Sequence, residues 1–387
     1  MEVVYIFHIF VFIRIRKLNF TTMIKLASRR IAATMIVSCF ISSVAFSQFD
    51  NVDFLRSATT DGAKFIEAYI SPWANAFGAG MNGSWYNTAK PHKLGGFDIT
   101  IGINVGVVPT SAQTFDVSSI GLSSSLSGTG DAPTVAGPGE DGPQMTYSII
   151  DPTYGSIQVA SFKTPPGTDW KYVPVPTAQV GIGLPLGTEL KIRYIPKIKI
   201  KDGDVSLWGL GLMHSIVQYL PGNKLLPVDA SLFAGYTRLT ANVPLSLMPD
   251  DSYPWNYTTY DQFTAFDNQN MCSTVEALNI SAIGSLNLPV ITFYGGLGYS
   301  KTRTLVKLEG NFPLPSVVTP AAAAPYVEYN DSGVKKGNDF PDIDVKNFSG
   351  LRANIGFRIK LAVITIHADY TRAQYNVLST GLGISFR

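Results

Sequence analysis

The chain has 387 residues, of which 45% are hydrophobic and 15% are charged, and its formal net charge is +2 at pH 7. A balance so close to neutral argues against a nucleic-acid partner, because nucleic-acid-binding domains carry clusters of positive charge. The length allows one large core or two domains.

The N-terminal residues carry the pattern of a secretory signal peptide. A basic stretch from Met23 to Arg30 precedes an apolar run from Ile31 to Phe46, and small residues stand just before Gln48. We therefore predict a signal peptide over residues 23–47, cleaved between Ser47 and Gln48. A retained membrane anchor is the alternative, but the apolar run is short for a span of roughly 20 residues.

Residues 1–22 fit no targeting pattern, and we predict that they are a mis-annotated extension before a true start at Met23. A lipid-anchored Cys39 is a further alternative, since the residues before it loosely fit a lipoprotein cleavage box. Cleavage after Ser47 removes Cys39 and leaves Cys272 as the single cysteine. An exported chain with one cysteine has no internal disulfide, so its stability must come from another source, such as a closed barrel.

Residues 48–96 differ from the rest of the chain and contain a helical pattern. Large apolar side chains recur at helical spacing within residues 59–81, Thr60 or Asp61 can serve as the N-cap, and Pro72 limits the run. We predict a short amphipathic helix that cannot cross a membrane. It can plug the lumen of a barrel, lie as a lid against its mouth, or pack on lipid.

From Phe97 to the end of the chain, apolar and polar side chains alternate with the two-residue period of a strand. The predicted strands cover residues 97–108, 175–184, 188–200, 205–219, 226–242, 272–288, 290–304, 346–359, 361–372 and 374–387. Most are longer than the usual globular strand of about 5–6 residues and suit a tilted membrane crossing of about 9–11. Segments 156–163 and 257–267 have a weaker pattern, so we expect 10–14 strands, with 12 favoured.

The connections between these segments alternate in length. Short ones, such as residues 185–188, are separated by long ones at 109–174, 243–271 and 305–345, and every long connection falls at the same end. Short periplasmic turns and long external loops are typical of outer-membrane barrels. We predict an all-β fold, a transmembrane antiparallel β-barrel over residues 97–387 in the cell outer membrane, with mobile Gly/Ser/Pro-rich loops. A soluble β-sandwich is the alternative, but it does not explain the strand lengths.

One strand carries a row of cations on a single face. In the segment from Glu189 to Gly203, apolar residues occupy the even positions and basic residues most of the odd ones. A cation facing lipid at the bilayer midplane costs about 2–4 kcal/mol, so these side chains must face the lumen or lie near a rim. A basic stripe of this kind can bind a carboxylate or a phosphate group. The predicted lumenal stripe consists of Lys191, Arg193, Lys197, Lys199, Arg352 and Arg358.

Two histidines stand beside candidate catalytic partners. His214 and Ser215 are adjacent on a strand and so face opposite sides, which argues against joint action on one substrate. His367 and Asp369 lie two apart on a predicted lumenal face, where they can form a general-base pair, but a lumenal polar network is the favoured interpretation. The few histidines and the cysteine show no ligand spacing. We expect no enzyme activity, no cofactor and no metal site.

The last strand carries a spacing of its own. Ser379, Gly381, Ile384 and Phe386 match the pattern polar–x–Gly–x–x–apolar–x–aromatic. This pattern resembles the signal that the barrel-assembly machinery recognises on the last strand of outer-membrane barrels, although Arg387 follows the aromatic residue. The resemblance implies that this machinery is a partner, together with outer-membrane lipid.

Three stretches, residues 67–109, 178–200 and 209–237, carry a family resemblance. The chain resembles an uncharacterised family of Gram-negative outer-membrane proteins that is distantly similar to the long-chain fatty-acid and toluene transporter barrels. The resemblance implies a plug before the first strand and a lateral or lumenal path for hydrophobic molecules. It brings no ligand-binding motif that could be carried over to residues of this chain.

Together these features predict a function without a nucleic-acid partner. We expect passive transport or binding of small hydrophobic molecules. The alternative is a structural barrel whose long external loops bind a partner, and a barrel hydrolase is less favoured.

Overall fold

The computed structural model describes residues 59–200, 203–219, 227–249, 251–261, 264–320, 323–345 and 348–386. The described residues all belong to one compact unit of the chain. The predicted extension, the signal peptide and its cleavage site between Ser47 and Gln48 lie outside the described residues.

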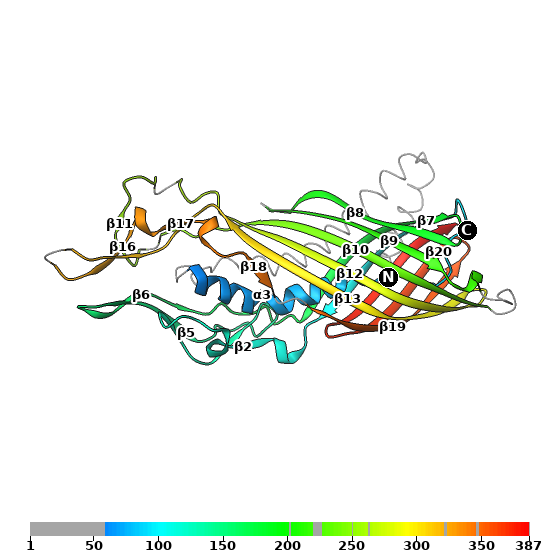
Figure 1. Cartoon of the computed structure of the whole chain (residues 1–387), viewed down its shortest axis with the longest axis horizontal. Helices are drawn as coiled ribbons and strands as arrows, with labels where there is room; N and C mark the ends of the chain where they lie inside the picture. Colours follow the sequence, from blue (N-terminus) through cyan, green and yellow to red (C-terminus); the bar gives the residue numbers. More distant parts are fainter. Residues whose placement is uncertain are drawn as a thin grey trace, which may run out of the picture. The chain divides into compact units, whose positions relative to one another are not determined.

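Ten strands of the described residues close into one antiparallel barrel (Figure 1). They are β1 (Phe97–Val107), β7 (Tyr172–Leu184), β8 (Thr188–Ile200), β9 (Gly203–Ser215), β10 (Val228–Pro244), β12 (Asn270–Asn287), β13 (Ile291–Glu309), β19 (Ser349–Leu361), β20 (Ile364–Arg372) and β21 (Asn376–Phe386). Each pairs with the next barrel strand along the chain, and β1 pairs with β21 to close the ring. The predicted barrel is confirmed, with a strand number at the lower end of the expected range rather than the favoured twelve.

The two segments with a weaker strand pattern do not enter the barrel. Residues 156–163 fall in β6 (Gly155–Lys163), which pairs with β5 (Gln144–Asp151) in a separate sheet. Phe162 of β6 packs in an apolar cluster of the loops, so the apolar side chain of this strand is buried there and does not face lipid. The described part of residues 257–267 forms turns and no strand.

The two ends of the barrel differ. Short turns follow β7, β12 and β19 and a short connection follows β9, all at one end, which we call the turn end. Long connections follow β1, β10 and β13 at the opposite end, which we call the loop end. In the three-residue β7–β8 turn, Leu186 (φ 58°) and Gly187 (φ 62°) both have left-handed backbone, which reverses the chain within a short connection.

The long loops contain small sheets, whereas we expected mobile segments. These sheets are formed by β2 (Thr114–Asp116) with β4 (Asp131–Pro133), β3 (Leu126–Ser127) with β5 and β6, β14 (Asn311–Pro313) with β17 (Val334–Lys336), and β11 (Trp255–Asn256) with β16 (Tyr326–Asn330) and β15 (Ser316–Val318). Another short strand, β18 (Ile343–Val345), extends the barrel sheet beside β13. Short 3-10 helices cover Thr110–Ala112, Val117–Ile120, Val217–Tyr219, Asp331–Gly333 and Gly337–Asp339. Apolar side chains of the loops pack together, which explains the order.

Helix α3 (Thr59–Met81) has the bounds of the predicted pattern, but Pro72 lies inside it and does not end it. Proline cannot donate the backbone hydrogen bond of its turn, and the burial of helix residues on both sides of Pro72 offsets that loss. Asp61, a predicted N-cap, instead lies in the first turn and accepts a hydrogen bond from the backbone N–H of Ser123 at 2.9 Å. Its carboxylate therefore ties the helix to a loop.

The helix runs from the loop sheets into the barrel (Figure 1). Phe65 and Tyr69 in its first half are buried among loop residues. Phe77 and Met81 in its second half are buried against inward side chains of the barrel strands. Residues 82–96 then continue to the start of β1 at the turn end. We call residues 59–96 the plug, because the stretch from the second half of α3 to the start of β1 occupies the lumen.

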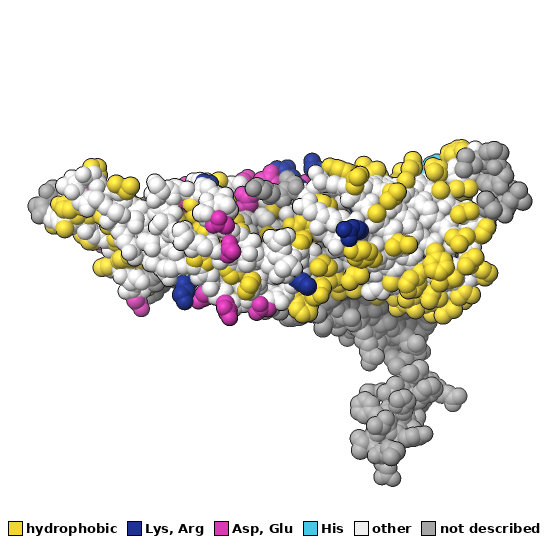
Figure 2. All heavy atoms as spheres, turned by 90° about the horizontal axis from the view of Figure 1, so that it is seen from below, with side chains coloured by type: hydrophobic (Ala, Val, Ile, Leu, Met, Phe, Trp, Pro, Cys, Tyr) yellow, Lys and Arg dark blue, Asp and Glu magenta, His cyan; other side chains and the backbone are white. Residues whose placement is uncertain are grey.

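Side chains of the barrel strands alternate between an apolar outer face and a mostly polar inner face. On β19, Leu351 and Ile355 are 84% and 71% exposed, whereas Arg352 and Asn354 are buried. Figure 2 shows the hydrophobic side chains gathered in a band over the barrel, with most charged side chains over the loops. Such a band is typical of a barrel in a bilayer. Among the described helices, none is long and apolar enough to cross a membrane.

Candidate functional site in the barrel lumen

Arg193 of β8 binds the end of the plug helix. It is 1% exposed and donates hydrogen bonds to the carbonyl oxygens of Met81 at 2.7 Å and Gly83 at 2.6 Å. Its guanidinium carbon lies 3.7 Å from the ring centroid of Trp85, and its Nε donates to the side chain of Gln179. A helix leaves carbonyls of its last turn without partners, so Arg193 supplies a donor to Met81 at the helix end and another to Gly83 just beyond it.

Arg352 and Arg358 of β19 hold the residues that follow the helix. Arg352 donates to the carbonyl oxygen of Asn82 at 2.7 Å, and Arg358 donates to the side-chain oxygen of Asn87 at 3.2 Å. In the ring of ten strands, β8 and β19 stand five places apart, so they face each other across the lumen. Arg193, Arg352 and Arg358 therefore bind the plug from opposite walls of the barrel.

Lys197 and Lys199 do not belong to this lumenal set. The register between β8 and β9 shifts between Ile195 and Ile198, which breaks the alternation of faces along β8. Beyond the shift Lys197 is exposed and pairs with Asp204 at 3.1 Å, and Lys199 is also exposed. The interpretation of all the odd-numbered cations as lumenal is therefore wrong for these two, because a bulge ends the strict two-residue period.

An aromatic layer fills the lumen between the end of α3 and the turn end of the barrel. Trp85 and Tyr86 of the plug pack against Phe233 of β10, with ring centroids 5.5 Å apart in both pairs. Gly211 and Gly235 of the wall face this layer. A Cβ atom on Gly211 would lie 2.9 Å from the Trp85 ring, and one on Gly235 would lie 2.6 Å from the Phe233 ring. The missing side chains of the wall make room for those of the plug.

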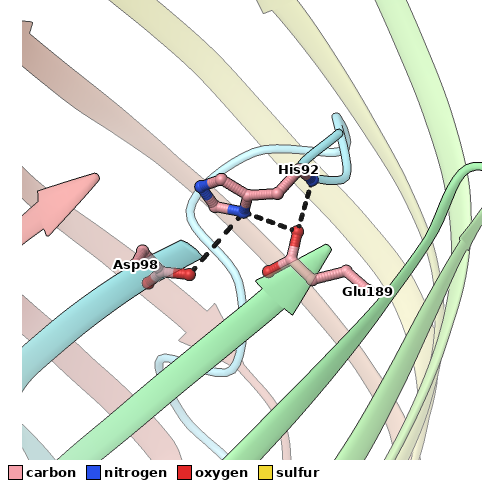
Figure 3. Close-up of side chains that lie close together, drawn as sticks. All are labelled: His92, Asp98 and Glu189. Atoms are coloured by element: carbon pink, nitrogen blue, oxygen red, sulfur yellow. Dashed lines mark hydrogen bonds and ion pairs between the residues drawn. The ribbon is translucent and has the colours of Figure 1, made fainter. Parts of the chain in front are cut away.

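Three buried titratable side chains meet near the turn end (Figure 3): His92 from the plug, Asp98 from β1 and Glu189 from β8. The backbone N–H and the ring Nδ1 of His92 both lie 2.9 Å from Oε2 of Glu189, and a carboxylate can only accept these hydrogen bonds. Asp98 Oδ1 lies 3.8 Å from the same Nδ1, and the hydroxyl of Ser385 lies 3.1 Å from Nε2. The cluster ties the end of the plug to β1, β8 and β21.

Lys191 completes the cluster by binding the other oxygen of Glu189. The ammonium group of Lys191 supplies a positive charge beside Glu189, as a buried carboxylate requires. The ligand atoms of His92, Asp98 and Glu189 lie within 4.8 Å of one another, which is also suitable for a metal ion. A divalent ion would have to displace the donors on Glu189 and lie beside an ammonium group. The geometry therefore favours a hydrogen-bonded latch over a metal centre.

The sequence gives no local signal for this cluster, because its members come from three separate segments. His92 stands in a stretch without regular structure. Asp98 and Glu189 could have been noticed only as acidic residues on the predicted lumenal faces of two strands. Their meeting with His92 depends on the path of the plug through the barrel.

His367 and Asp369 both face the lumen from β20, and they are 1% and 8% exposed. Asp369 accepts a hydrogen bond from the hydroxyl of Tyr294 at 3.0 Å. His367 stands opposite Arg358 in the strand register. Neither ring nitrogen of His367 has a hydrogen-bond partner within the described ranges. The two side chains thus have different neighbours rather than a hydrogen bond to each other.

The residues of the C-terminal pattern divide between the faces of β21. Ser379 and Gly381 are buried on the inner face. Ile384 and Phe386 are 47% and 44% exposed on the outer face, and Phe386 packs on Phe97 of β1 with ring centroids 5.1 Å apart. An exposed aromatic residue thus marks the strand that closes the ring.

Comparisons with known proteins give a family but no activity. A family model described as "Family of unknown function (DUF6588)" matches residues 23–386. No curated protein matches the sequence.

Several solved structures resemble the fold at low similarity. The attachment invasion locus protein Ail of Yersinia pestis is 7% identical, with 76% of this chain and 98% of that chain covered and a TM-score of 0.22. The outer membrane protease OmpT of Escherichia coli is 10% identical, with 75% and 97% covered and a TM-score of 0.29. A Pseudomonas aeruginosa FadL homologue is 8% identical, with 75% and 89% covered and a TM-score of 0.19. The barrel assignment rests on the strand pairing of this chain and not on these likenesses.

The expectation that the protein is not an enzyme has to be corrected. A protease is among the similar structures, and the matching family has no known function. Neither finding excludes catalysis, so the absence of an activity does not follow from the barrel.

Proposed function

The chain belongs to the DUF6588 family of unknown function, which brings no activity with it, and we propose that it is an outer-membrane barrel that binds or passively passes small hydrophobic molecules through a lumen closed by its own plug. In this proposal the turn end faces the periplasm, and the chain is exported by a cleaved signal peptide. The barrel-assembly machinery would recognise the last strand through Ser379, Gly381, Ile384 and Phe386.

The observation that carries the proposal is the apolar half of the lumen. Toward the loop end, the inward side chains include Val175, Leu207, Leu239 and Val275, and they are buried against the second half of α3. Toward the turn end, the inward side chains are largely polar or charged. A hydrophobic molecule entering from the loop end would meet the surface that the helix now covers. A polar or acidic group on that molecule would point toward the basic residues.

The way the plug is attached supports a movable closure. The plug forms no strand in the barrel sheet. Many of its polar contacts to the wall are made through side chains, such as those of Arg193, Arg352 and Glu189, and backbone hydrogen bonds join its end to β7 at Gly95 and Gly96. Side-chain contacts can be exchanged one at a time, whereas a paired strand would have to leave the sheet as a unit. A bound ligand could therefore replace the helix without opening the barrel wall.

A reversible cross-link between the plug and the wall tests this proposal. A Cβ atom on Gly80 would lie 3.2 Å from Cβ of Val175 on β7, close to the disulfide range of about 3.5–4.5 Å. The variant Gly80→Cys/Val175→Cys, made with Cys272→Ser, would be refolded and inserted into planar bilayers. We expect conductance steps in the reduced protein and their loss on oxidation.

The matched controls are the two single-cysteine variants, which should conduct alike with and without reductant. Hydrophobic acids added on the loop side should change the frequency of the steps in the reduced protein. Equal silence of the reduced and oxidised forms would contradict passage through the lumen.

The loops favour binding of a partner as the second candidate function. The β5–β6 hairpin exposes Ile150 and Tyr154 at 69% and 52%, and Trp170 nearby in the chain is 53% exposed. Large apolar side chains on an ordered loop surface commonly mark an interaction site. Replacing Ile150 and Tyr154 with serine should abolish such binding and leave conductance unchanged.

A further inference from the structure

The outer wall of the barrel has a groove across β9, β10, β12 and β13. Ala234 and Ala282 carry only a methyl group there, and larger outward side chains surround them. The hollow has a volume of about 480 Å³. Its outward lining includes Leu212, Leu232, Ala234, Ile280, Leu297 and Tyr299. Because Leu297 is 70% exposed and belongs to the outer apolar band, lipid chains rather than water would surround this groove in a membrane.

Cations follow the groove toward the loop end. On β13, Lys301 is the next outward residue after Tyr299, and Arg303 is the one after that. Outward positions on a strand are spaced by about 7 Å, so Lys301 lies about one such step beyond the groove. The strand register places Arg238 of β10 and Arg303 in one row, with Glu276 between them. The apolar groove and the row of basic residues thus lie on the same strands.

The two arginines have acidic neighbours, and Lys301 has none that forms an ion pair within the described ranges. Arg238 lies 3.9 Å from Glu276, and Arg303 lies 2.9 Å from Asp344. The side chains of Arg238 and Arg303 are 46% and 50% exposed. All three cations are therefore accessible to an anionic group at the edge of the apolar band, and Lys301 is nearest to the groove.

We propose that this wall is a binding surface for a phosphorylated glycolipid of the lipid A type, with an acyl chain in the groove and a phosphate on Lys301 and Arg303. The chemistry of the surface matches both parts of such a lipid. The loop end, where the cations stand, faces outward in outer-membrane barrels, and lipid A is the phosphate-bearing lipid of that leaflet. An exposed cation near a membrane surface attracts anionic lipid headgroups.

A strand outside the groove supplies a matched control. On β20, Arg372 follows Tyr370 as Lys301 follows Tyr299, and both residues face outward. Neither Tyr370 nor Arg372 lines the groove. Arg372 is therefore an outward cation that follows an outward tyrosine, without an adjacent hollow.

The test is lipid retention by the full-length exported chain in native mass spectrometry. The protein would be mixed with equal amounts of lipid A and phosphatidylethanolamine. We expect preferential retention of lipid A, about fivefold weaker retention in Lys301→Gln, and unchanged retention in Arg372→Gln. Ala234→Leu/Ala282→Leu, which fills the groove, should also weaken retention, and Lys301→Arg should preserve it.

Several results would overturn the proposal. Equal retention of the two lipids would remove the role of the phosphate, and an equal loss in Arg372→Gln would show that any surface cation suffices. Unchanged retention in the groove-filled variant would remove the role of the acyl chain. Because Lys301→Arg keeps the charge, weak retention in that variant too would reveal damage to the barrel instead of a lost contact.

Discussion

Arg193 illustrates how one buried side chain connects sequence pattern, packing and closure of the lumen. Its place on an inward strand position follows from the alternation along β8. Its role depends on the plug that it contacts. The carbonyl oxygens of Met81 and Gly83 accept the hydrogen bonds that Arg193 could otherwise donate to a ligand. The basic residues of the lumen thus stabilise the plug, and any anionic ligand has to compete with it.

Replacing Arg193 with alanine should destabilise the protein by about 3 kcal/mol or more. Two buried carbonyl groups and the Gln179 side chain would lose their donor, and each unsatisfied buried group costs about 1–3 kcal/mol. Urea unfolding in micelles would measure the change in the free energy of unfolding. The control is Lys197→Ala, whose exposed ion pair should contribute less than about 1 kcal/mol. Similar effects of the two substitutions would contradict the assigned role.

The pair of Glu189 and Lys191 should show strong coupling. Glu189→Gln leaves a buried ammonium without its carboxylate, which costs about 3–5 kcal/mol. The double variant Glu189→Gln/Lys191→Met removes both charges and should recover most of that loss. The same urea titration would measure it. A double variant that is no more stable than Glu189→Gln alone would show that the pair is not the main contact.

At the scale of elements, α3 packs in two different environments, and its sequence pattern does not distinguish them. The half before Pro72 packs among the loops, and the half after it packs inside the barrel. The loops are ordered partly because they pack on this helix. A single carboxylate can also hold a loop in place by accepting hydrogen bonds from its backbone. Asp331, directly after β16, accepts hydrogen bonds from the backbone N–H groups of Thr258 and Thr259.

The loop around Asp331 should open in acid. The hydrogen bonds from Thr258 lower the pKa of Asp331 to about 2. A lowered pKa means that the contribution of Asp331 to stability is complete above its ordinary pKa and is lost as the pH falls toward 2. Pepsin cuts beside aromatic residues, so cleavage at Tyr257 and Tyr260 should increase between pH 4 and pH 2. In Asp331→Asn the increase should already be present at pH 4.

Over the whole molecule, the outward apolar band determines where the barrel can reside. Ile355 lies within this band on β19, and Ser349 lies at the loop end of the same strand. Both face outward, so they differ chiefly in their depth. This difference provides a test of the membrane position that does not depend on any ligand.

Ile355→Arg should cost about 2–4 kcal/mol in a bilayer, whereas Ser349→Arg should cost about 0–1 kcal/mol. The expected difference arises because an arginine at mid-depth must leave water, and one near the interface need not. Folding titrations in lipid vesicles would measure both values. Equal costs would mean that the band does not mark the span of the membrane.

Much of this structure could be predicted from the sequence. The two-residue period from Phe97 onward determined the strands, their inner and outer faces and the one-sided placement of the long loops, because a strand with one face in lipid must alternate. The helix within residues 59–81 was predictable from its spacing for the same local reason. The bulge beyond Ile195 was not, since cations on both sides of it keep the same sequence period.

The sequence by itself determined a barrel with apolar outer and polar inner faces, because those patterns depend on neighbours along the chain. Only the tertiary structure decided that the inner cations hold a plug, and that His92 meets Asp98 and Glu189. It also decided that the groove on the outer wall leads to Lys301. These features join segments far apart in the chain, and their physical basis is contact across the lumen or between strands, which no local pattern records.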